Sequence, residues 1–326
     1  LKVEYNHEVN SFKEFLKLDH DAVFIGTGAP KGKDLNIPGR QEASNNIHIG
    51  IDFLASVAFE HVSKIGKKVI VLGGGNTAMD CCRTAVRLGG KEVGVYVRSP
   101  KVDMKASDWE VEEAEMENIP IYENHVPKEF IVKDGKLCGM LFEKVTAEYS
   151  NGKRKLIPTG EPLVEVECDD VLMAIGQDNA FEWMEKDLGI EFGEWDMPVV
   201  DKKTMQSTLP KVFFGGDAAW GPENIITAVA HAHQAAISID LFCNGKDLNE
   251  RPEPHVFLES SKMGLHEWSY DNGYDEVERL SVPHADLKES LKNRKLEVEL
   301  GYDDEMAFQE ASRCLNCDVQ TVFEEN

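Results

Sequence analysis

Gly73, Gly75 and Ala78 follow an apolar run and form the pattern G-x-G-x-x-A. The first glycine permits a tight turn, the second lets the backbone approach a pyrophosphate, and the alanine lets a helix pack closely against a strand. Asn76 and Thr77 would begin that helix, and its N-terminus would face the phosphates. These residue types at this spacing predict a binding turn for a dinucleotide.

The flanking residues have the pattern of the strand–helix–strand unit that such a turn requires. An apolar strand is predicted over 69–72, and apolar residues recur at helical spacing over 76–88. Gly89 and Gly90 supply a stop, and a second strand is predicted over 93–97. The alternative interpretation is that the glycines only make a turn.

The residues after the second strand bear on which nicotinamide cofactor binds. No acidic residue stands where one would hold a ribose 2′-hydroxyl; the chain has Arg98, Ser99 and Lys101 there. Two cations near the ribose suit a 2′-phosphate, so the sequence favours NADP(H) over NAD(H). In the alternative interpretation both cations are ordinary solvated surface residues.

Composition narrows the class of protein. The 326 residues suffice for two domains, and the net charge of -24 would repel the phosphates of nucleic acid and of anionic membranes, which argues against both as partners. We identify no long uncharged apolar run for a membrane span and no signal peptide, so a cytoplasmic location is expected. The 7 cysteines, an odd number, indicate a reducing compartment, and Cys81 and Cys82 are expected to pack in the core.

Three other predicted strands end at glycine. One over 21–25 leads to Gly26–Gly28, and the residues after Pro30 lack helical periodicity. A second over 170–173 leads to Ala174, Ile175 and Gly176. The third, over 212–214, leads to Gly216 and Asp217 and then to a predicted helix over 225–242.

In this order, several stretches resemble signatures of the glutamate synthase small-subunit family of NAD(P)H- and FAD-dependent oxidoreductases: Phe24–Ala29, Gly73–Asp80, Met104–Ala106, Ala174–Gln177 and Gly216–Asp217. They also resemble the amino-terminal part of dihydropyrimidine dehydrogenase. The resemblance covers roughly residues 20 to 245. It implies an α/β fold of two interleaved Rossmann-like domains, like those of glutathione reductase.

The family organisation leads to specific expected boundaries. Residues 1–61 would be a segment of the FAD domain, 62–166 an inserted NAD(P)H domain, and 167–245 the return segment of the FAD domain. Residues 246–326 would be an extension that ends in C-x-x-C. The family's first flavin fingerprint is not found before residue 20, so we expect an FAD domain incomplete at its N-terminus, in a piece of a longer polypeptide.

The resemblance also implies roles for individual residues. Ala174, Ile175 and Gly176 would join the Gly73 turn in binding NAD(P)H. For FAD, Asp217 would hydrogen-bond the ribityl chain, and the other implied contacts are Thr27, Gly28, Gly216, Ile225, Ile226 and Thr227. Two smaller expectations rest on pattern alone: a meander over 133–162 and an acidic amphipathic helix over 287–300.

The C-terminal residues resemble the E-A-x-R-C-L-x-C opening of the family's iron-sulfur motifs. Cys314 and Cys317 have ligand spacing, but a [4Fe-4S] cluster needs four ligands and no third cysteine follows. Zinc binding, a redox-active dithiol or an inert pair are the alternatives.

The expected activity is hydride transfer from a nicotinamide nucleotide to FAD, with electrons then passing to an iron-sulfur domain or a larger catalytic subunit. Because the cofactors carry this chemistry, no catalytic side chain is expected. One alternative is a thiol-linked flavin reductase, although no C-x-x-C lies between residues 67 and 166. The other is a non-catalytic interaction module that binds nucleotide as a sensor.

Overall fold

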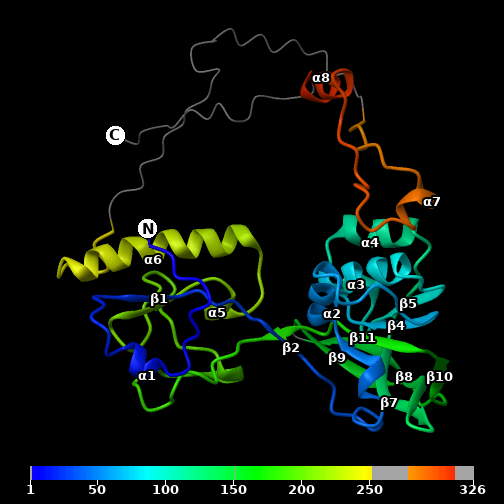
Figure 1. Cartoon of the computed structure of the whole chain (residues 1–326), viewed down its shortest axis with the longest axis horizontal. Coiled ribbons are helices and arrows are strands. Elements are labelled where there is room, and N and C mark those ends of the chain that lie inside the picture. Colours follow the sequence, from blue (N-terminus) through cyan, green and yellow to red (C-terminus); the bar gives the residue numbers. More distant parts are fainter. Residues whose placement is uncertain (1, 151, 252–277, 313–326) are drawn as a thin grey trace. The chain divides into compact units, whose positions relative to one another are not determined.

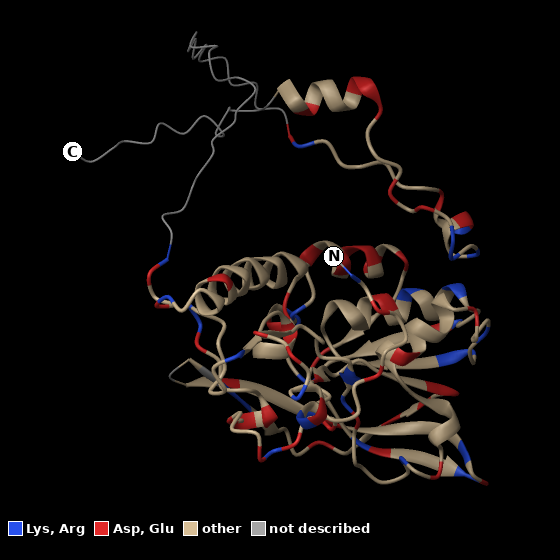
Figure 2. Ribbon diagram, turned by 60° about the vertical axis from the view of Figure 1, so that its left-hand side comes forward, with Lys and Arg blue, Asp and Glu red and all other residues tan. Residues whose placement is uncertain are grey.

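The computed structural model describes residues 2–150, 152–251 and 278–312 (Figure 1). The chain divides into two compact units, residues 1–251 and 252–326. Within the described residues, the larger unit contains the parallel and the antiparallel sheets. Acidic residues are spread over helices and loops of both units, in keeping with the negative net charge (Figure 2).

A five-stranded parallel sheet carries the Gly73 turn. Its strand order is β3-β11-β4-β5-β6, formed by β3 (Ile47–Ile49), β11 (Asp170–Met173), β4 (Lys68–Leu72), β5 (Glu92–Tyr96) and β6 (Ile121–Tyr122). The helices of this region are α2 (Gly50–Ala58), α3 (Asn76–Arg87) and α4 (Asp108–Met116). The strand–helix–strand prediction for residues 69–97 is confirmed.

Alternation along β4 explains how both faces of this sheet are covered. Val69 and Val71 pack with residues of α2, α3 and α4, whereas Ile70 and Leu72 pack with the antiparallel strands on the other face. All four side chains are nearly or fully buried. Since successive strand residues point to opposite faces, a continuous apolar run is what a sheet covered on both sides requires.

The antiparallel sheet is formed by β7 (His125–Lys133), β8 (Lys136–Ser150), β9 (Lys153–Pro158) and β10 (Val164–Glu167). Asp134 and Gly135 join β7 to β8 with φ values of 52° and 72°. Positive φ at both turn residues matches the right-handed twist of hairpin strands, which explains the Asp-Gly pair. The expected meander over 133–162 is therefore confirmed.

A second, smaller parallel arrangement lies elsewhere in the larger unit. β1 (Val23–Ile25) pairs with β13 (Val212–Phe214), and a separate core packs around them. This region also contains α1 (Phe12–Phe15), α5 (Asp217–Trp220) and α6 (Ile225–Cys243). An antiparallel pair of short strands, β2 (Lys31–Gly32) and β12 (Gln177–Asp178), lies between the two regions in sequence. Short 3-10 turns occur at Ser44–Asn46, Lys101–Asp103 and Glu194–Asp196.

The five-stranded sheet extends beyond the boundaries expected from the sequence. β3 lies before residue 62 and β11 lies after residue 166, yet both belong to this sheet, and β11 is a direct neighbour of β4. The β2–β12 pair therefore marks the limits of the inserted region better than residues 62 and 166 do.

Helix α6 has an unusually apolar exposed surface. Among the described helices it is long and apolar enough to cross a bilayer by length and composition, with a mean hydropathy of 1.3, so the expectation of no such run does not hold here. Only 17% of the tested window is buried. Length and composition alone do not distinguish a membrane span from a helix that packs on protein.

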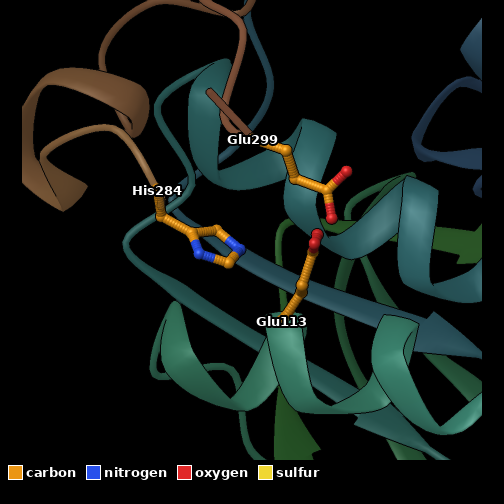
Figure 3. A group of neighbouring side chains, drawn as sticks. All are labelled: Glu113, His284 and Glu299. Atoms are coloured by element: carbon orange, nitrogen blue, oxygen red, sulfur yellow. The ribbon is translucent and has the colours of Figure 1, made fainter. Parts of the chain in front are cut away.

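In the C-terminal unit the described elements are α7 (Leu287–Ser290) and α8 (Asp304–Ser312). His284 and Glu299 pair in an isolated antiparallel bridge (Figure 3). The expected helix over 287–300 is wrong, because it ends after a single turn at Ser290. The Asn293 side chain accepts a hydrogen bond from the Lys295 amide, a local turn that competes with helical pairing.

Candidate functional site

The Gly73 turn lies between the carboxyl ends of three neighbouring strands. Its amide donates to the carbonyl oxygen of Tyr96 at 3.2 Å. A Cβ atom at Gly73 would lie 2.1 Å from the carbonyl oxygen of Ala174, and its φ is 131°. Both the close approach and the backbone conformation require glycine. The turn is therefore held in one geometry by β5 and β11.

The same packing brings the predicted Ala174–Gly176 segment to the Gly73 turn. The Ala174 amide donates to the carbonyl of Leu72 at 2.7 Å. Ala174 and Ile175 are half-buried, whereas Gly176 is exposed with a φ of 120°. The Ala174–Ile175 backbone therefore lies directly against Gly73.

Gly75 leaves that space open. It precedes α3 with extended backbone, and a Cβ there would meet no atom within 4 Å. The amides of Gly75, Asn76 and Thr77 find no acceptor among the described residues. Ala78, in contrast, is fully buried in the core and packs rather than faces a ligand. Three free amides at a helix N-terminus behind an open glycine fit a diphosphate.

The segment before α4 closes over one side of the turn. The amides of Lys105 and Ala106 donate to the carbonyl of Gly74 at 2.8 and 2.9 Å. The Asn76 side-chain oxygen accepts the Ser107 amide at 2.9 Å. The Asn76 side chain therefore fixes the segment that leads into α4. The same segment places the exposed Lys105 beside the glycine turn.

The cations predicted near the ribose differ in whether they already pair with other residues of the chain. Arg98 is exposed and has no hydrogen bond or ion pair within the described residues. Lys101 is engaged: its ammonium lies 2.6 Å from Glu115 and its amide donates to Glu123. Ser99 is 8% exposed and faces the interior. Arg98 and Lys105 are thus better placed for a phosphate than Lys101 or Ser99. The Met104–Ala106 signature was the sequence signal that could have identified Lys105.

A buried ionic network holds α4 against α3. The Glu117 carboxylate accepts from Arg83 Nε at 2.9 Å and from Arg87 at 2.7 and 2.8 Å. Glu113 on α4 (Figure 3) also pairs with Arg83. Glu117 has a side-chain exposure of 4%. The network supports the helix whose N-terminus forms the candidate site.

The cysteines of α3 behave as core residues. Cys81 and Cys82 are fully buried, as the sequence predicts. Burial raises the pKa of the Cys82 thiol to about 12 and raises the pKa of Cys81 further still. A thiol held this far from its thiolate form is a poor nucleophile. Cys314 and Cys317 lie outside the described residues.

A second glycine site forms at the carboxyl ends of β1 and β13. These strands are parallel neighbours, so Gly26–Gly28 and Gly215–Asp217 meet at one edge, and the Gly215 amide donates to Ile25 at 3.2 Å. Thr27 is exposed, and Gly28 has a φ of 72° with open space at its Cβ position. Gly216, with φ 60° and ψ -150°, takes a conformation restricted to glycine.

The residues after this turn complete the second site. The Asp217 side chain accepts the Glu223 amide at 3.1 Å. Asn224 caps α6 by accepting the Thr227 amide at 2.8 Å, a role the sequence analysis missed although Asn before an apolar run indicates an N-cap. Ile225 and Ile226 are 81% and 76% exposed. The Asp217 carboxylate therefore holds the loop that leads into α6.

Comparison with known proteins identifies the family. The model of the pyridine nucleotide-disulphide oxidoreductase family matches residues 2–236. The chain belongs to this family. Membership of this family implies the use of FAD and NAD(P).

Individual relatives agree with this assignment. The chain is 32% identical over 306 residues to NADP(+)-dependent formate dehydrogenase subunit beta of Moorella thermoacetica, covering 93% of this chain and 43% of the relative. It is 32% identical over 246 residues to the glutamate synthase [NADPH] small chain of Halomonas elongata, covering 70% and 51%. The expected family resemblance is confirmed. The chain spans about half the length of these curated relatives.

Solved structures support the fold. Mycobacterium tuberculosis FprA in complex with NADPH has a TM-score of 0.60 and 16% sequence identity, covering 74% of this chain and 68% of FprA. The expected α/β fold of two Rossmann-like domains is therefore confirmed.

Proposed function

We propose that the chain is the electron-input part of an NADPH-dependent flavin oxidoreductase similar to the glutamate synthase small subunit. The observation that supports this is the open face of Gly75 in front of three amides that have no acceptor in the described part of the chain, with Lys105 beside the turn and the exposed Arg98 two residues after β5. Bound together, the two cofactors would supply the chemistry: the nicotinamide gives a hydride to the flavin, which releases electrons singly.

The chain's own residues would bind and orient the two cofactors. The amides at the start of α3 would hold the diphosphate, and the Gly73 turn would prevent the phosphates from shifting because β5 and β11 hold it. Arg98 and Lys105 would favour a 2′-phosphate over a hydroxyl, which favours NADP(H) over NAD(H). Asp217 and the first turn of α6 would bind FAD.

The electrons would leave through an iron-sulfur centre or a larger catalytic subunit. Two relatives support this by name, since each is a subunit designated beta or small chain. We propose Cys314 and Cys317 as two ligands of a [4Fe-4S] cluster whose other ligands lie elsewhere. Neither nucleic acid nor a membrane is proposed as a partner, and a cytoplasmic location stays a prediction.

Substitution of Gly75 tests the nucleotide site. Gly75→Ala adds a methyl group where nothing lies within 4 Å and where φ is negative, so folding stability should change by no more than about 0.5 kcal/mol. The methyl would occupy the space needed by the diphosphate, so the NADPH dissociation constant should rise at least about tenfold, equal to about 1.4 kcal/mol.

Gly193→Ala is the matched control, because Gly193 also has negative φ and only one atom near its Cβ position, at 3.9 Å. It should leave NADPH affinity unchanged in isothermal titration. Equal affinity in the Gly75→Ala variant and the wild type would contradict the proposed site.

A spectroscopic assay separates the alternatives in the full-length protein. Bound flavin and NADPH-driven dye reduction would support the enzyme, whereas NADPH binding without flavin would support the sensor. Loss of disulfide reduction in Cys314→Ser or Cys317→Ser, with flavin reduction by NADPH retained and no iron-sulfur absorbance in the wild type, would favour the thiol-linked reductase.

A further inference from the structure

His231 on α6 contacts both ends of α5, the short helix that begins at Asp217. Its Nδ1 accepts a hydrogen bond from the Gly216 amide at 3.2 Å. Its ring also lies against the Trp220 ring, with centroids 4.6 Å apart at 63°. One imidazole therefore bridges the residue before α5 and the residue at its end.

The hydrogen bond determines the form of the ring. Since the Gly216 amide donates, Nδ1 must carry a lone pair, so the imidazole is neutral with its proton on Nε2. Gly216 itself has no side chain with which to cap α5, and no side-chain cap is present at that position. His231 supplies from another helix the polar partner that the turn lacks.

Packing around this turn leaves no room for side chains at Gly215 and Gly216. A Cβ at Gly215 would lie 2.8 Å from the Phe24 ring and 3.3 Å from the Cβ of His231. A Cβ at Gly216 would lie 3.2 Å from that of Ala228. Ala228 and His231 are three residues apart and so share one face of α6. The glycine turn is therefore enclosed by β1 on one side and α6 on the other.

We infer that His231 is a positioning residue for the flavin-binding turn: by holding the Gly216 amide it sets the orientation of Asp217. This inference rests on the proposed function, because Asp217 is assigned to FAD there. His231 acts on the protein backbone and takes no part in hydride transfer. It explains why a histidine, rather than an apolar residue, lies on the face of α6 that meets the turn.

Three substitutions test the role in the full-length protein. His231→Leu removes the acceptor and keeps an apolar side chain. His231→Asn returns an acceptor, because its Oδ1 is as many bonds from the backbone as Nδ1. His233→Leu is the matched control, two residues along the same helix and exposed.

The FAD dissociation constant, measured by flavin fluorescence, should rise about tenfold or more in His231→Leu. It should remain within about threefold of wild type in His231→Asn and in His233→Leu. NADPH affinity at the α3 site should be unchanged in all three, which shows that each variant is folded. Flavin affinity of His231→Leu equal to that of wild type would overturn the inference, as would equal weakening in His231→Leu and His231→Asn.

Hydrogen exchange of the Gly216 amide in flavin-free protein is an independent readout. Protection should fall in His231→Leu and return in His231→Asn, and unchanged protection in His231→Leu would overturn the inference. If the wild-type protein binds no FAD, the proposed flavin site itself is wrong. The exchange result then still shows whether His231 holds the Gly216 amide.

Discussion

The two glycine sites have the same local pattern but differ in what holds them. The Gly73 turn is embedded in a five-stranded sheet with packed layers on both faces. The Gly215–Asp217 turn follows a two-stranded pair, and α6 beside it has only three buried residues, Ala235, Ser238 and Leu241. The first turn thus lies in a core that covers both faces of a sheet, whereas the second lies between a smaller core and a mostly exposed helix. Breaking a buried contact should therefore cost more stability in the first region than in the second.

The largest effect is expected at Glu117. Glu117→Ala leaves Arg87 without its buried carboxylate and Arg83 with only Glu113 and Glu110, which should lower the free energy of unfolding by about 3 kcal/mol. The control Glu115→Ala breaks the exposed pair with Lys101 and should cost less than about 1 kcal/mol. Urea denaturation measures both. Similar losses in the two variants would contradict the view that buried support distinguishes the first site.

Asp170 should give the first region a pH-dependent stability. Burial raises its pKa, but hydrogen bonds from His48, the Gly66 amide and Asn46 outweigh burial and lower the pKa overall. A carboxyl with a lowered pKa in the folded state contributes stability above its unfolded pKa of about 3.9 and loses it as pH falls through the folded value.

Asp170→Asn should therefore lower stability at pH 7 by about 2 kcal/mol. The difference from wild type should shrink as the pH falls below about 4, where the carboxyl of the unfolded chain takes up a proton while that of the folded chain is still ionised. Thermal denaturation across this range provides the measurement. A deficit that is the same at pH 7 and pH 3 would show that ionisation of Asp170 does not contribute.

Arg98 tests whether the first site selects a phosphorylated ribose. Arg98→Ala should raise the KM for NADPH about tenfold, since a charge-assisted hydrogen bond is worth about 1.5–3 kcal/mol. The KM for NADH should change little. Lys101→Ala is the control, because Lys101 already pairs with Glu115. A larger effect at Lys101 than at Arg98 would reverse their assigned roles.

The smallest stability effect is expected at the second site. Asn224→Ala removes the cap of α6, which should cost about 1 kcal/mol. It should weaken FAD binding while leaving NADPH affinity unchanged, and fluorescence titrations of both ligands would show this. If the substitution weakened FAD binding and NADPH binding equally, the two binding regions would not be independent of each other.

Local patterns in the sequence predicted the parts of the structure that depend on local interactions. The Gly73 turn, α3 and the start of α6 follow from glycine spacing and helical periodicity. Pairings between distant residues were not predictable in the same way. β3 joins the sheet through the pairing of Ile47 with Val171, which no local pattern indicates.

The candidate site shows the same division. The position of Arg98 after β5 follows from the strand prediction. The engagement of Lys101 does not, because Glu115 and Glu123 come from α4 and from the loop after β6. The contact between His231 and Gly216 depends on how α6 packs against the β13 turn, although helical periodicity alone places His231 and His233 on different faces.

The short β2–β12 ribbon has a practical consequence. Gly32 pairs with Gln177, so the polypeptide leaves and re-enters at neighbouring points, and the intervening stretch contains the whole five-stranded sheet. A stretch with adjacent ends behaves as a cassette: it can be excised, expressed alone or transplanted into a related host by joining two sites. Exchange of coenzyme preference between relatives could thus proceed by moving one continuous piece.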